Sequence, residues 1–381
     1  MMIGTACRAI ATAVLLAGLA GCSSAIQPDA DPAGRAPVRL AIINPQTGDF
    51  SPLGKWEHKG VKLAVDEANA TGGVNGHRIE LAVFDDQGDP KKAATLTEQV
   101  AGAGYSAIFG SALSGNALAM VPVMDRLHIP AITSGQAPSL AALKDPYLFL
   151  NSTTSTTFDE TLSAYVVDKL KLTSIALISN DGAYGKGERA AFTAALASRG
   201  LAPVADQVVS VGQKDFTSAL SVVKLRGPRA LFIGAEELQS GLLAAQARAA
   251  GITATLIGAA PMGTDVFLNT AGAEAAEGAL FSTPYPTNDE NESTRAFAAA
   301  YESAYGEVPE FHAAKAYDGA RIVIEALRSS GNATGLALAQ TIRATRFRGL
   351  LGNFAFDASG VGIQRTRVAT IKAGKIAALT T

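Results

Sequence analysis

Three short loops hold the polar side chains that are best placed to do chemistry. In the loop Gly110 to Gly115, the Ser114 hydroxyl and its neighbouring N–H groups precede a helical pattern, so they can bind an anion such as a carboxylate or simply cap that helix. The loop Thr133 to Gln136 offers hydroxyl and amide groups to a ligand, or forms an ordinary turn. Tyr184 follows a third strand pattern, as a ligand contact or as a packed surface aromatic. Each loop alone is a weak signal.

Residues typical of catalytic and metal sites do not occur in the patterns that such sites require. The four histidines are His58, His77, His128 and His312. They lie far apart, and none belongs to an H-E-x-x-H motif. No nucleophile elbow, phosphate-binding loop or dinucleotide glycine fingerprint follows a strand pattern. We therefore expect no enzyme, no catalytic residue, no cofactor and no metal site.

The elements that must position these loops alternate between strand and helix. Around Asn69 to Pro90, a helix ends near Gly72, a strand follows, and Pro90 opens the next helix. The first series of strands is predicted at 38–43, 79–84, 105–109, 130–133 and 147–151, with helices at 56–69, 90–103 and 116–127. Short apolar strands that alternate with helices predict a parallel sheet of the α/β class, whose ligands bind beyond the carboxyl ends of the strands.

A second series begins after residue 151 and predicts a second, similar lobe. Its strands are predicted at 174–179, 208–211, 230–234 and 255–258, with helices at 158–170, 186–199, 216–225 and 239–250. The last hundred residues give helices at 293–305, 313–329 and 336–345 and strands at 354–356 and 368–371, which are too few for a third sheet. We therefore predict an N-terminal lobe of residues 38–150 and 284–363, and a C-terminal lobe of residues 151–283 and 364–381.

The N-terminal leader indicates export. An apolar run from Ala9 to Ala20 is too short for a confident membrane span and ends in Leu19-Ala20-Gly21-Cys22, which resembles a bacterial lipobox. We expect a signal peptide at 1–21, lipidation of Cys22 and a flexible tether at 22–37, although an ordinary secretory signal remains an alternative. Cys7 and Cys22 are the two cysteines, so the folded part is expected to hold no disulfide and no reactive thiolate.

Composition and charge describe a globular protein rather than a nucleic-acid-binding one. The 381 residues are 48% hydrophobic and 17% charged, which allows two domains of ordinary size. Removal of residues 1–21 would change the formal net charge from −2 to −3, because Arg8 is the one charged residue among them. This balance offers no basic surface for nucleic acid.

Taken in order, the motifs resemble the leucine/isoleucine/valine-binding family of type I periplasmic solute-binding proteins, which serve ABC importers. The matching stretches are Thr47 to Gly54, Asn69 to Pro90, Gly110 to Ser114, Ile129 to Pro138, Asp181 to Gly185, Lys214 to Phe216, Gln246 to Arg248, Ala316 to Asp318 and Gly349 to Asp357. The resemblance covers essentially all of the mature chain. It implies two Rossmann-like lobes with parallel sheets, joined by several hinge crossovers, that close on a ligand. It also implies that the strand 79–84 lies at a sheet edge and is scaffold.

The resemblance implies a set of ligand contacts. Ser114 and the groups around Ser134 and Gln136 would receive a carboxylate, Leu53 would lie at the cleft mouth, and Tyr184 would cover the ligand. Glu236 falls near a family position that usually holds an aromatic contact. The acid that amino-acid binders often use for the ligand ammonium would fall at 258–261, where this chain has none. Either Glu236 or Glu237 replaces it, or the ligand is an amide, a urea-like compound or an organic acid.

The expected partners follow from the same resemblance. The protein would be a monomer, lipid-anchored in the periplasm or at the cell surface, and would deliver an amino acid of the branched-chain type or a related solute to a permease and its ATPase. The alternative is a ligand sensor, or a regulator of an envelope enzyme, with the same fold and no importer.

Overall fold

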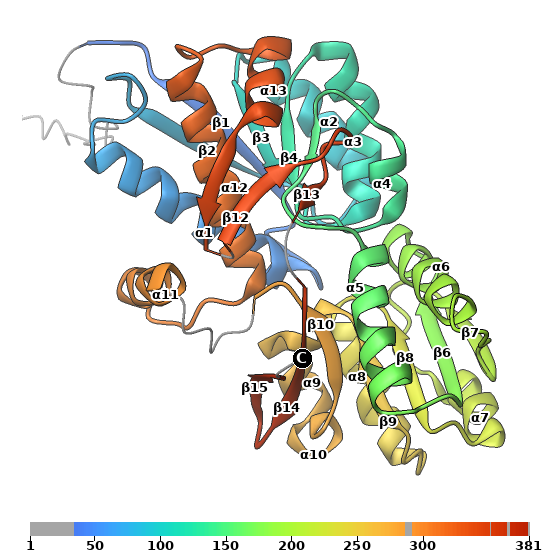
Figure 1. Cartoon of the computed structure of the whole chain (residues 1–381). Coiled ribbons are helices and arrows are strands. Elements are labelled where there is room, and N and C mark those ends of the chain that lie inside the picture. Colours follow the sequence, from blue (N-terminus) through green and yellow to red (C-terminus); the bar gives the residue numbers. More distant parts are fainter. Residues whose placement is uncertain (1–33, 286–291, 351, 364–365, 380–381) are drawn as a thin grey trace, which may run out of the picture. The chain divides into compact units, whose positions relative to one another are not determined.

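The computed structural model describes residues 34–285, 292–350, 352–363 and 366–379. Residues 35–381 form one compact unit, in which two sheets are each covered by helices (Figure 1). The predicted signal peptide at 1–21, the predicted lipidation site Cys22 and most of the predicted tether at 22–37 lie outside the described residues. In the described ranges, no helix is both long and apolar enough to cross a membrane.

The first sheet is entirely parallel. Its strands are β1 (Val38–Asn44), β2 (Ile79–Asp85), β3 (Ala107–Gly110), β4 (Ala131–Thr133) and β5 (Leu148–Leu150), in the order β2-β1-β3-β4-β5. They are largely buried except for β2, which is partly exposed. In this register Ile42 of β1 lies between Val83 of β2 and Phe109 of β3. The strand predicted at 79–84 is therefore an edge strand, as expected. Its entry turn requires glycine at Gly73, where φ is +69° and a Cβ atom would lie 2.0 Å from the His77 carbonyl oxygen.

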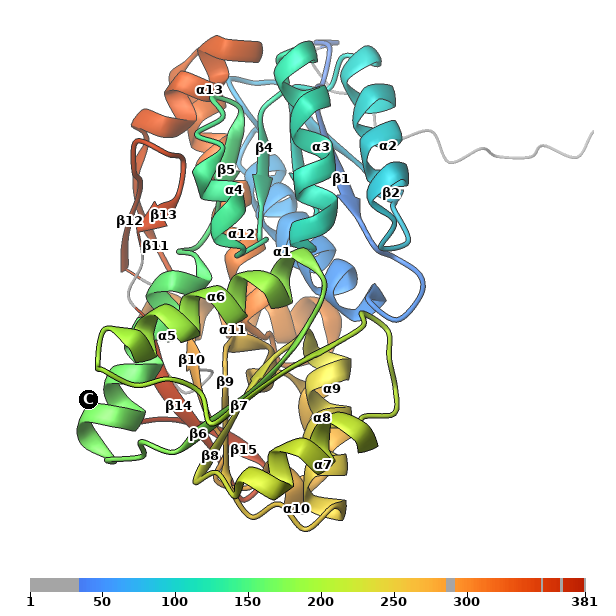
Figure 2. The same ribbon diagram turned by 90° about the vertical axis from the view of Figure 1, so that its right-hand side faces the viewer.

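Helices cover both faces of this sheet, and the chain's later segments supply some of them (Figure 2). They are α1 (Ser51–Ala70), α2 (Pro90–Gly102), α3 (Ser114–Leu127), α4 (Pro138–Ala142), α12 (Phe311–Ser329) and α13 (Gly335–Ala344), whereas α11 (Glu292–Tyr305) packs on α1. The side chain of Asp89 caps α2 by accepting the N–H of Lys91 at 2.7 Å, and Pro90 occupies the first turn. Helices α1 and α12 pack closely, and this packing requires glycine at Gly60. A Cβ atom there would lie 2.2 Å from the Ala313 carbonyl oxygen.

The second sheet has a parallel centre and an antiparallel extension. Its strands are β6 (Ile175–Asn180), β7 (Ala205–Val209), β8 (Ala230–Gly234), β9 (Thr255–Gly258), β10 (Leu280–Thr283), β14 (Arg367–Lys372) and β15 (Lys375–Ala378), in the order β15-β14-β10-β9-β8-β6-β7. Strand β14 runs antiparallel to both β10 and β15. The late strand predicted at 368–371 thus joins the second sheet. The sequence analysis missed β10 and β15, and placed β7 at 208–211 instead of Ala205–Val209.

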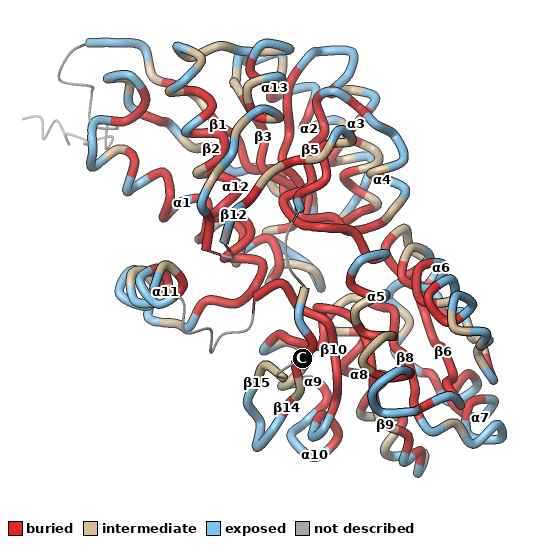
Figure 3. The backbone as a smooth tube through the Cα atoms, in the orientation of Figure 1, coloured by how far each residue is buried: buried red, intermediate tan, exposed pale blue. Residues whose placement is uncertain are grey.

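The second sheet separates two apolar cores, and its central strands are buried (Figure 3). Its helical segments are α5 (Ser155–Ser163), a π-helical turn (Ala164–Lys169), α6 (Ala183–Ala197), α7 (Thr217–Arg226), α8 (Glu237–Ala249), a 3-10 turn (Ala260–Gly263), α9 (Asp265–Ala271) and α10 (Ala273–Ala276). On the α5 and α6 side, Phe192 stacks on Phe232 with ring centroids 3.8 Å apart. On the other side, Phe216 of the loop before α7, Leu243 of α8 and Phe267 of α9 pack against the sheet.

The prediction that the last hundred residues hold too few strands for a third sheet is wrong, because a small antiparallel sheet there completes the first lobe. This sheet consists of β11 (Arg346–Gly349), β12 (Gly352–Phe356) and β13 (Gly362–Ile363). Phe356 packs on Phe149 of β5 with ring centroids 5.1 Å apart, so this sheet belongs to the core of the first lobe. The chain leaves the first sheet after β5 and forms the strands of the second sheet from β6 to β10. It then leaves the second sheet and returns to it at β14.

Candidate functional site

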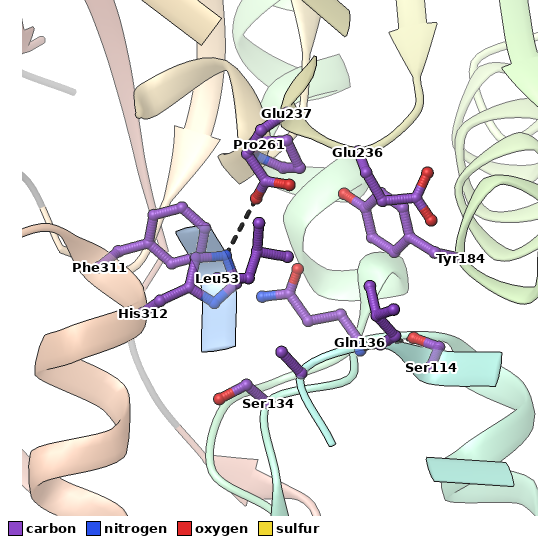
Figure 4. A pocket seen from close by; sticks show the side chains of 12 residues that line it. Leu53, Ser114, Ser134, Gln136, Tyr184, Glu236, Glu237, Pro261, Phe311 and His312 are labelled. Carbon is purple, nitrogen blue, oxygen red and sulfur yellow. Dashed lines mark hydrogen bonds and ion pairs between the residues drawn. The ribbon is translucent and has the colours of Figure 1, made fainter. Parts of the chain in front are cut away.

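A small cavity of about 30 Å³ lies where loops of the two lobes meet (Figure 4). It is lined by Leu53, Ala112, Leu113, Ser114, Ser134, Gln136, Tyr184, Glu236, Glu237, Pro261, Phe311 and His312. The structure therefore brings all six residues of the predicted site together, although they come from five separate loops and helix ends. The sequence analysis did not identify Phe311 or His312, and it named Glu237 only as a substitute for Glu236.

One corner of the cavity is organised around Ser114. This residue is the first of α3, but its side chain does not cap that helix. Its hydroxyl oxygen instead accepts the backbone N–H groups of Gln136 and Ala137, each at 3.2 Å. These two contacts use the oxygen as an acceptor, so the hydroxyl proton remains available to donate to a ligand. The positive end of α3 points to the same corner, which favours an anionic group there.

The loop after β4 is fixed by its own hydrogen bonds. Thr133 donates its hydroxyl to the Ser111 carbonyl at 2.6 Å and accepts the N–H of Gly135 at 2.9 Å. The hydroxyl of Ser134 accepts the side-chain amide of Asn151 at 3.1 Å. The predicted residue Ser134 is thus held in place before any ligand arrives, which lowers the entropy cost of binding.

The second lobe approaches this corner through α6. A Cβ atom at Gly187 would lie 2.9 Å from Cδ of Pro138 and 3.3 Å from Cα of Ala137, so a larger residue would separate the lobes. Tyr184 lies one turn earlier in α6 and forms a wall of the cavity; its phenol oxygen is buried and lies near Glu188. Leu53, with Ala112 and Leu113, forms an apolar wall on the opposite side.

Behind Tyr184, two carboxyl groups are fully buried in the second lobe. Asp159 of α5 shares its helix face with the core residue Leu162, and Glu188 of α6 shares its face with Phe192. Ser155 donates its hydroxyl to Glu188. Burial raises the pKa of Glu188 to about 7, and burial together with the Glu188 charge raises that of Asp159 well above its usual range. These groups are therefore at least partly protonated at neutral pH.

The two adjacent glutamates at the start of α8 have different surroundings. Glu236 accepts a hydrogen bond from the side chain of Asn180, and its carboxyl group lies beside the Tyr184 ring on the side away from His312 (Figure 4). Burial raises the pKa of Glu236 to about 7. Glu237 points toward His312, whose Nε2 atom lies 3.0 Å from its Oε1 atom. The Oε2 atom of Glu237 is buried and has no partner among the described residues.

His312 belongs to a buried charged cluster that the sequence analysis did not foresee. Its Nδ1 atom lies 3.5 Å from Oε1 of Glu57 in α1. Lys315, one turn further along α12, is fully buried and donates to the Ser134 carbonyl at 3.3 Å. Glu310, which caps α12, is a third nearby carboxyl group. The one sequence signal that could have pointed to His312 is its helical spacing from the motif Ala316 to Asp318. That spacing does not reveal the partners of His312, which lie far away in the sequence.

The chemistry of the cavity suits recognition rather than catalysis. Hydroxyl, amide and backbone N–H donors occupy one end, apolar side chains form the walls, and carboxyl groups face them from the second lobe. Across the described ranges, no group of three or more His, Cys, Asp or Glu residues is arranged to hold a metal ion. Such a mixture of apolar walls and few oriented polar groups is typical of a small-molecule binding site.

Two α/β lobes with a small polar cavity between them define a class of proteins that enclose a solute by hinge closure. The chain belongs to the periplasmic binding protein family, whose model matches residues 37–375. The predictions of an α/β class, of a type I periplasmic binding protein fold with two lobes, and of the family resemblance are confirmed.

Relatives and solved structures extend over most of the chain. The leucine-, isoleucine-, valine-, threonine-, and alanine-binding protein of Pseudomonas aeruginosa is 24% identical over 324 residues, which are 85% of this chain and 86% of that protein. The branched-chain amino acid transporter substrate binding protein LivJ of Streptococcus pneumoniae, solved with isoleucine, is 28% identical with a TM-score of 0.84 and covers 91% of this chain and 99% of its own. A solute binding protein of an R. palustris ABC transporter, solved with benzoate, shares the fold at 22% identity and a TM-score of 0.83, covering 90% and 96%.

The buried carboxyl groups predict an unusual pH dependence of stability. The pKa of Glu188 in the folded protein, about 7, lies above its usual value of 4.5, so its contribution is fully present below pH 4.5 and is lost as pH rises through about 7. Glu188→Gln should therefore raise the free energy of unfolding at pH 8 by roughly 1–3 kcal/mol, with no gain at pH 4.5. Denaturant titrations at both pH values measure this.

The matched control for Glu188→Gln is Glu302→Gln, which changes an exposed glutamate of α11. It should alter the free energy of unfolding by no more than about 0.5 kcal/mol at either pH. A Glu188→Gln protein that is less stable than the wild type at pH 8 would show that Glu188 is charged and stabilising in the folded state.

Proposed function

We propose that the protein is an extracytoplasmic solute-binding protein of an ABC importer. It captures an amino acid of the branched-chain type, or a related small carboxylate or amide, and delivers it to a permease and its ATPase. The observation that carries this proposal is the corner at Ser114, where two backbone N–H groups hold the hydroxyl oxygen and leave its proton for a ligand. The names of the relatives, which include binders of branched-chain amino acids, support the same substrate class.

The proposed contacts are Leu53, Ser114, Ser134, Gln136, Tyr184 and Glu236, with Glu237 as the neighbouring alternative for a ligand ammonium. The 3-10 turn Ala260–Gly263 forms part of the second lobe's edge and carries no acid. A ligand ammonium would therefore have to reach Glu236 or Glu237. A carboxylate ligand without an ammonium is the second candidate, because a protein of the same fold was solved with benzoate and because Glu237 is already paired with His312.

We also propose that Cys22 anchors the protein to a membrane through a lipid, that residues 22–37 form the tether, and that the protein is a monomer in the periplasm or at the cell surface. The lobes would comprise 38–150 with 284–363, and 151–283 with 364–381. The lipobox at Leu19 to Cys22 supports the anchor.

The anchor predicts that Cys22→Ala abolishes lipid labelling and moves the protein from the membrane fraction to the soluble fraction. Ser23→Ala is the control and should leave both unchanged. Lipid labelling that persists in Cys22→Ala would rule out this cysteine as the attachment site.

A thermal-shift screen of residues 35–381 against amino acids, amides and small carboxylates tests the proposed function. A ligand at 100 times its dissociation constant should stabilise the protein by about 2.7 kcal/mol. The absence of any shift across these three classes would contradict the proposal.

Two substitutions then identify the ligand's charged ends. Ser114→Ala should weaken a carboxylate ligand by about 1.5–3 kcal/mol, since it removes one charge-assisted hydrogen bond. Glu236→Gln should weaken an amino acid strongly, but should leave a purely anionic ligand bound as well as before or better. Calorimetric titration measures both effects.

Ser221→Ala, at an exposed serine of α7, is the control for Ser114→Ala and should bind normally. Wild-type affinity in Ser114→Ala would show that this corner does not receive the carboxylate. Full affinity for an amino acid in Glu236→Gln would move the ammonium site to Glu237.

A further inference from the structure

The lobes are joined inside the site by a buried ion pair. His312 is the second residue of α12 in the first lobe, and Glu237 is the first residue of α8 in the second. Their side chains are 6% and 3% exposed, and the Nε2 and Oε1 atoms lie 3.0 Å apart. In the described part of the chain, the other ion pair between the lobes joins Lys214 to Asp49 at 3.8 Å with both side chains largely exposed. An exposed pair contributes little, whereas loss of one partner from a buried pair leaves an uncompensated charge.

On its other side, the imidazole of His312 connects to the first lobe and to the corner at Ser114. Its Nδ1 atom lies 3.5 Å from Glu57 Oε1, and the Oε2 atom of Glu57 accepts the side-chain amide of Asn44 at 2.7 Å. The Oδ1 atom of Asn44 in turn accepts the N–H of Ala112 at 2.5 Å. Ala112 belongs to the loop that ends in Ser114. A continuous series of polar contacts thus leads from α8 of the second lobe to the predicted carboxylate corner of the first.

The charges around His312 favour its protonated form. Burial alone would lower its pKa, but Glu310 before α12, Glu237 of α8 and Glu57 of α1 outweigh this effect and raise the pKa to about 9. Lys315 of α12 is the other buried cation of the cluster, and burial lowers its pKa to about 8. At neutral pH both ring nitrogens of His312 therefore carry protons, which suits a ring placed between two carboxylates.

Aromatic rings fix the plane of the imidazole. Trp56 of α1 lies nearly parallel to it, with an interplanar angle of 15° and ring centroids 6.2 Å apart. Phe311 lies on the cavity wall with its ring centroid 4.1 Å from that of His312. The imidazole is therefore held with Nε2 hydrogen-bonded to Glu237 of the second lobe, while Nδ1 lies at ion-pair distance from Glu57 of the first lobe without a hydrogen bond to it. Trp56 is also the single tryptophan of the chain, so its fluorescence reports on this cluster alone.

We propose that His312 is a positioning residue that holds the two lobes together across the cavity. While it is protonated, it bridges Glu57 of the first lobe and Glu237 of the second. Closure of the lobes would form the bridge and opening would break it. When His312 loses its proton, Glu57 and Glu237 face each other without a cation between them, and the closed arrangement is disfavoured. The effect on ligand affinity rests on the proposed function, but the bridge itself does not.

The fluorescence of Trp56 tests the bridge without any ligand. A pH titration of residues 35–381 from pH 6 to pH 10.5 should show a transition near pH 9, because a protonated imidazole quenches a neighbouring indole. The transition should be absent in His312→Gln and should move to lower pH in Glu237→Gln, which removes a carboxylate that favours the proton. His77→Gln, at a histidine that contacts the Ala36 carbonyl, is the control and should titrate like the wild type.

Affinity measures the consequence for closure, with L-isoleucine as the probe. At pH 7, His312→Gln and Glu237→Gln should each weaken L-isoleucine binding roughly tenfold or more, and the double variant should be no weaker than either single one, since one bridge is lost in all three. The wild type should also lose affinity between pH 7 and pH 10, while His312→Gln should show a smaller change.

The outcomes separate the bridge from the proposed function. A fluorescence transition at the same pH in the wild type and Glu237→Gln would overturn the bridge, as would single losses of affinity that add in the double variant. If the wild type does not bind L-isoleucine, the fluorescence titration still decides on the bridge, and the screen of other solutes decides on the function. If circular dichroism shows His312→Gln to be unfolded, Glu237→Gln and the wild-type titration still give both results.

Discussion

All strands of the first sheet run in the same direction, and this constraint places most of the site. Because parallel strands end at one edge, the loops after β3 and β4 emerge side by side, and Ser114 meets the backbone N–H groups of Gln136 and Ala137 there. The parallel centre of the second sheet does the same for Tyr184 and Glu236, which follow β6 and β8. The cavity is the space that these two sets of loops leave between them.

Burying charge costs free energy, and two groups of buried residues near the site offset this cost in different ways. Around His312, two cations accompany three carboxyl groups, so the cluster is nearly balanced. Asp159 and Glu188 form no ion pair within the described residues, and their raised pKa values show that burial favours the neutral form instead. The first group places fixed charge at the junction of the lobes. The second group keeps the interior of the second lobe nearly neutral behind Tyr184.

Much of the fold could be predicted because local patterns carried it. Glycines that end helices, Pro90 at a helix start and short apolar strands predicted β1 to β5 and most helices of the first lobe, but not α4, β11 or β13. Strand β7 was displaced because its first residues, Ala205 to Gln207, are weakly apolar, as an edge strand permits. Strands β10 and β15 were not predicted; β10 pairs with β14, a segment far away in the sequence, and β15 is the short second strand of a hairpin with β14.

The predicted site residues lie together where loops follow strands, whereas partners that are remote in sequence were not predicted. Ser114, Gln136 and Tyr184 follow strand patterns, so their position made them candidates. His312 contacts Glu237 across 75 positions of sequence, and no local pattern encodes such a pair. By residue type, Asp159 and Glu188 are typical of surface positions. Their helical spacing from Leu162 and Phe192, however, places them on buried helix faces.

The central claim is that a solute bound between the lobes holds them closed. Small-angle X-ray scattering of residues 35–381, with and without a saturating solute from the screen, tests it most directly. The account predicts a smaller radius of gyration with the solute, because the loops of both lobes contact it at once. An identical scattering profile in the two states, with binding verified by calorimetry, would contradict closure on the ligand.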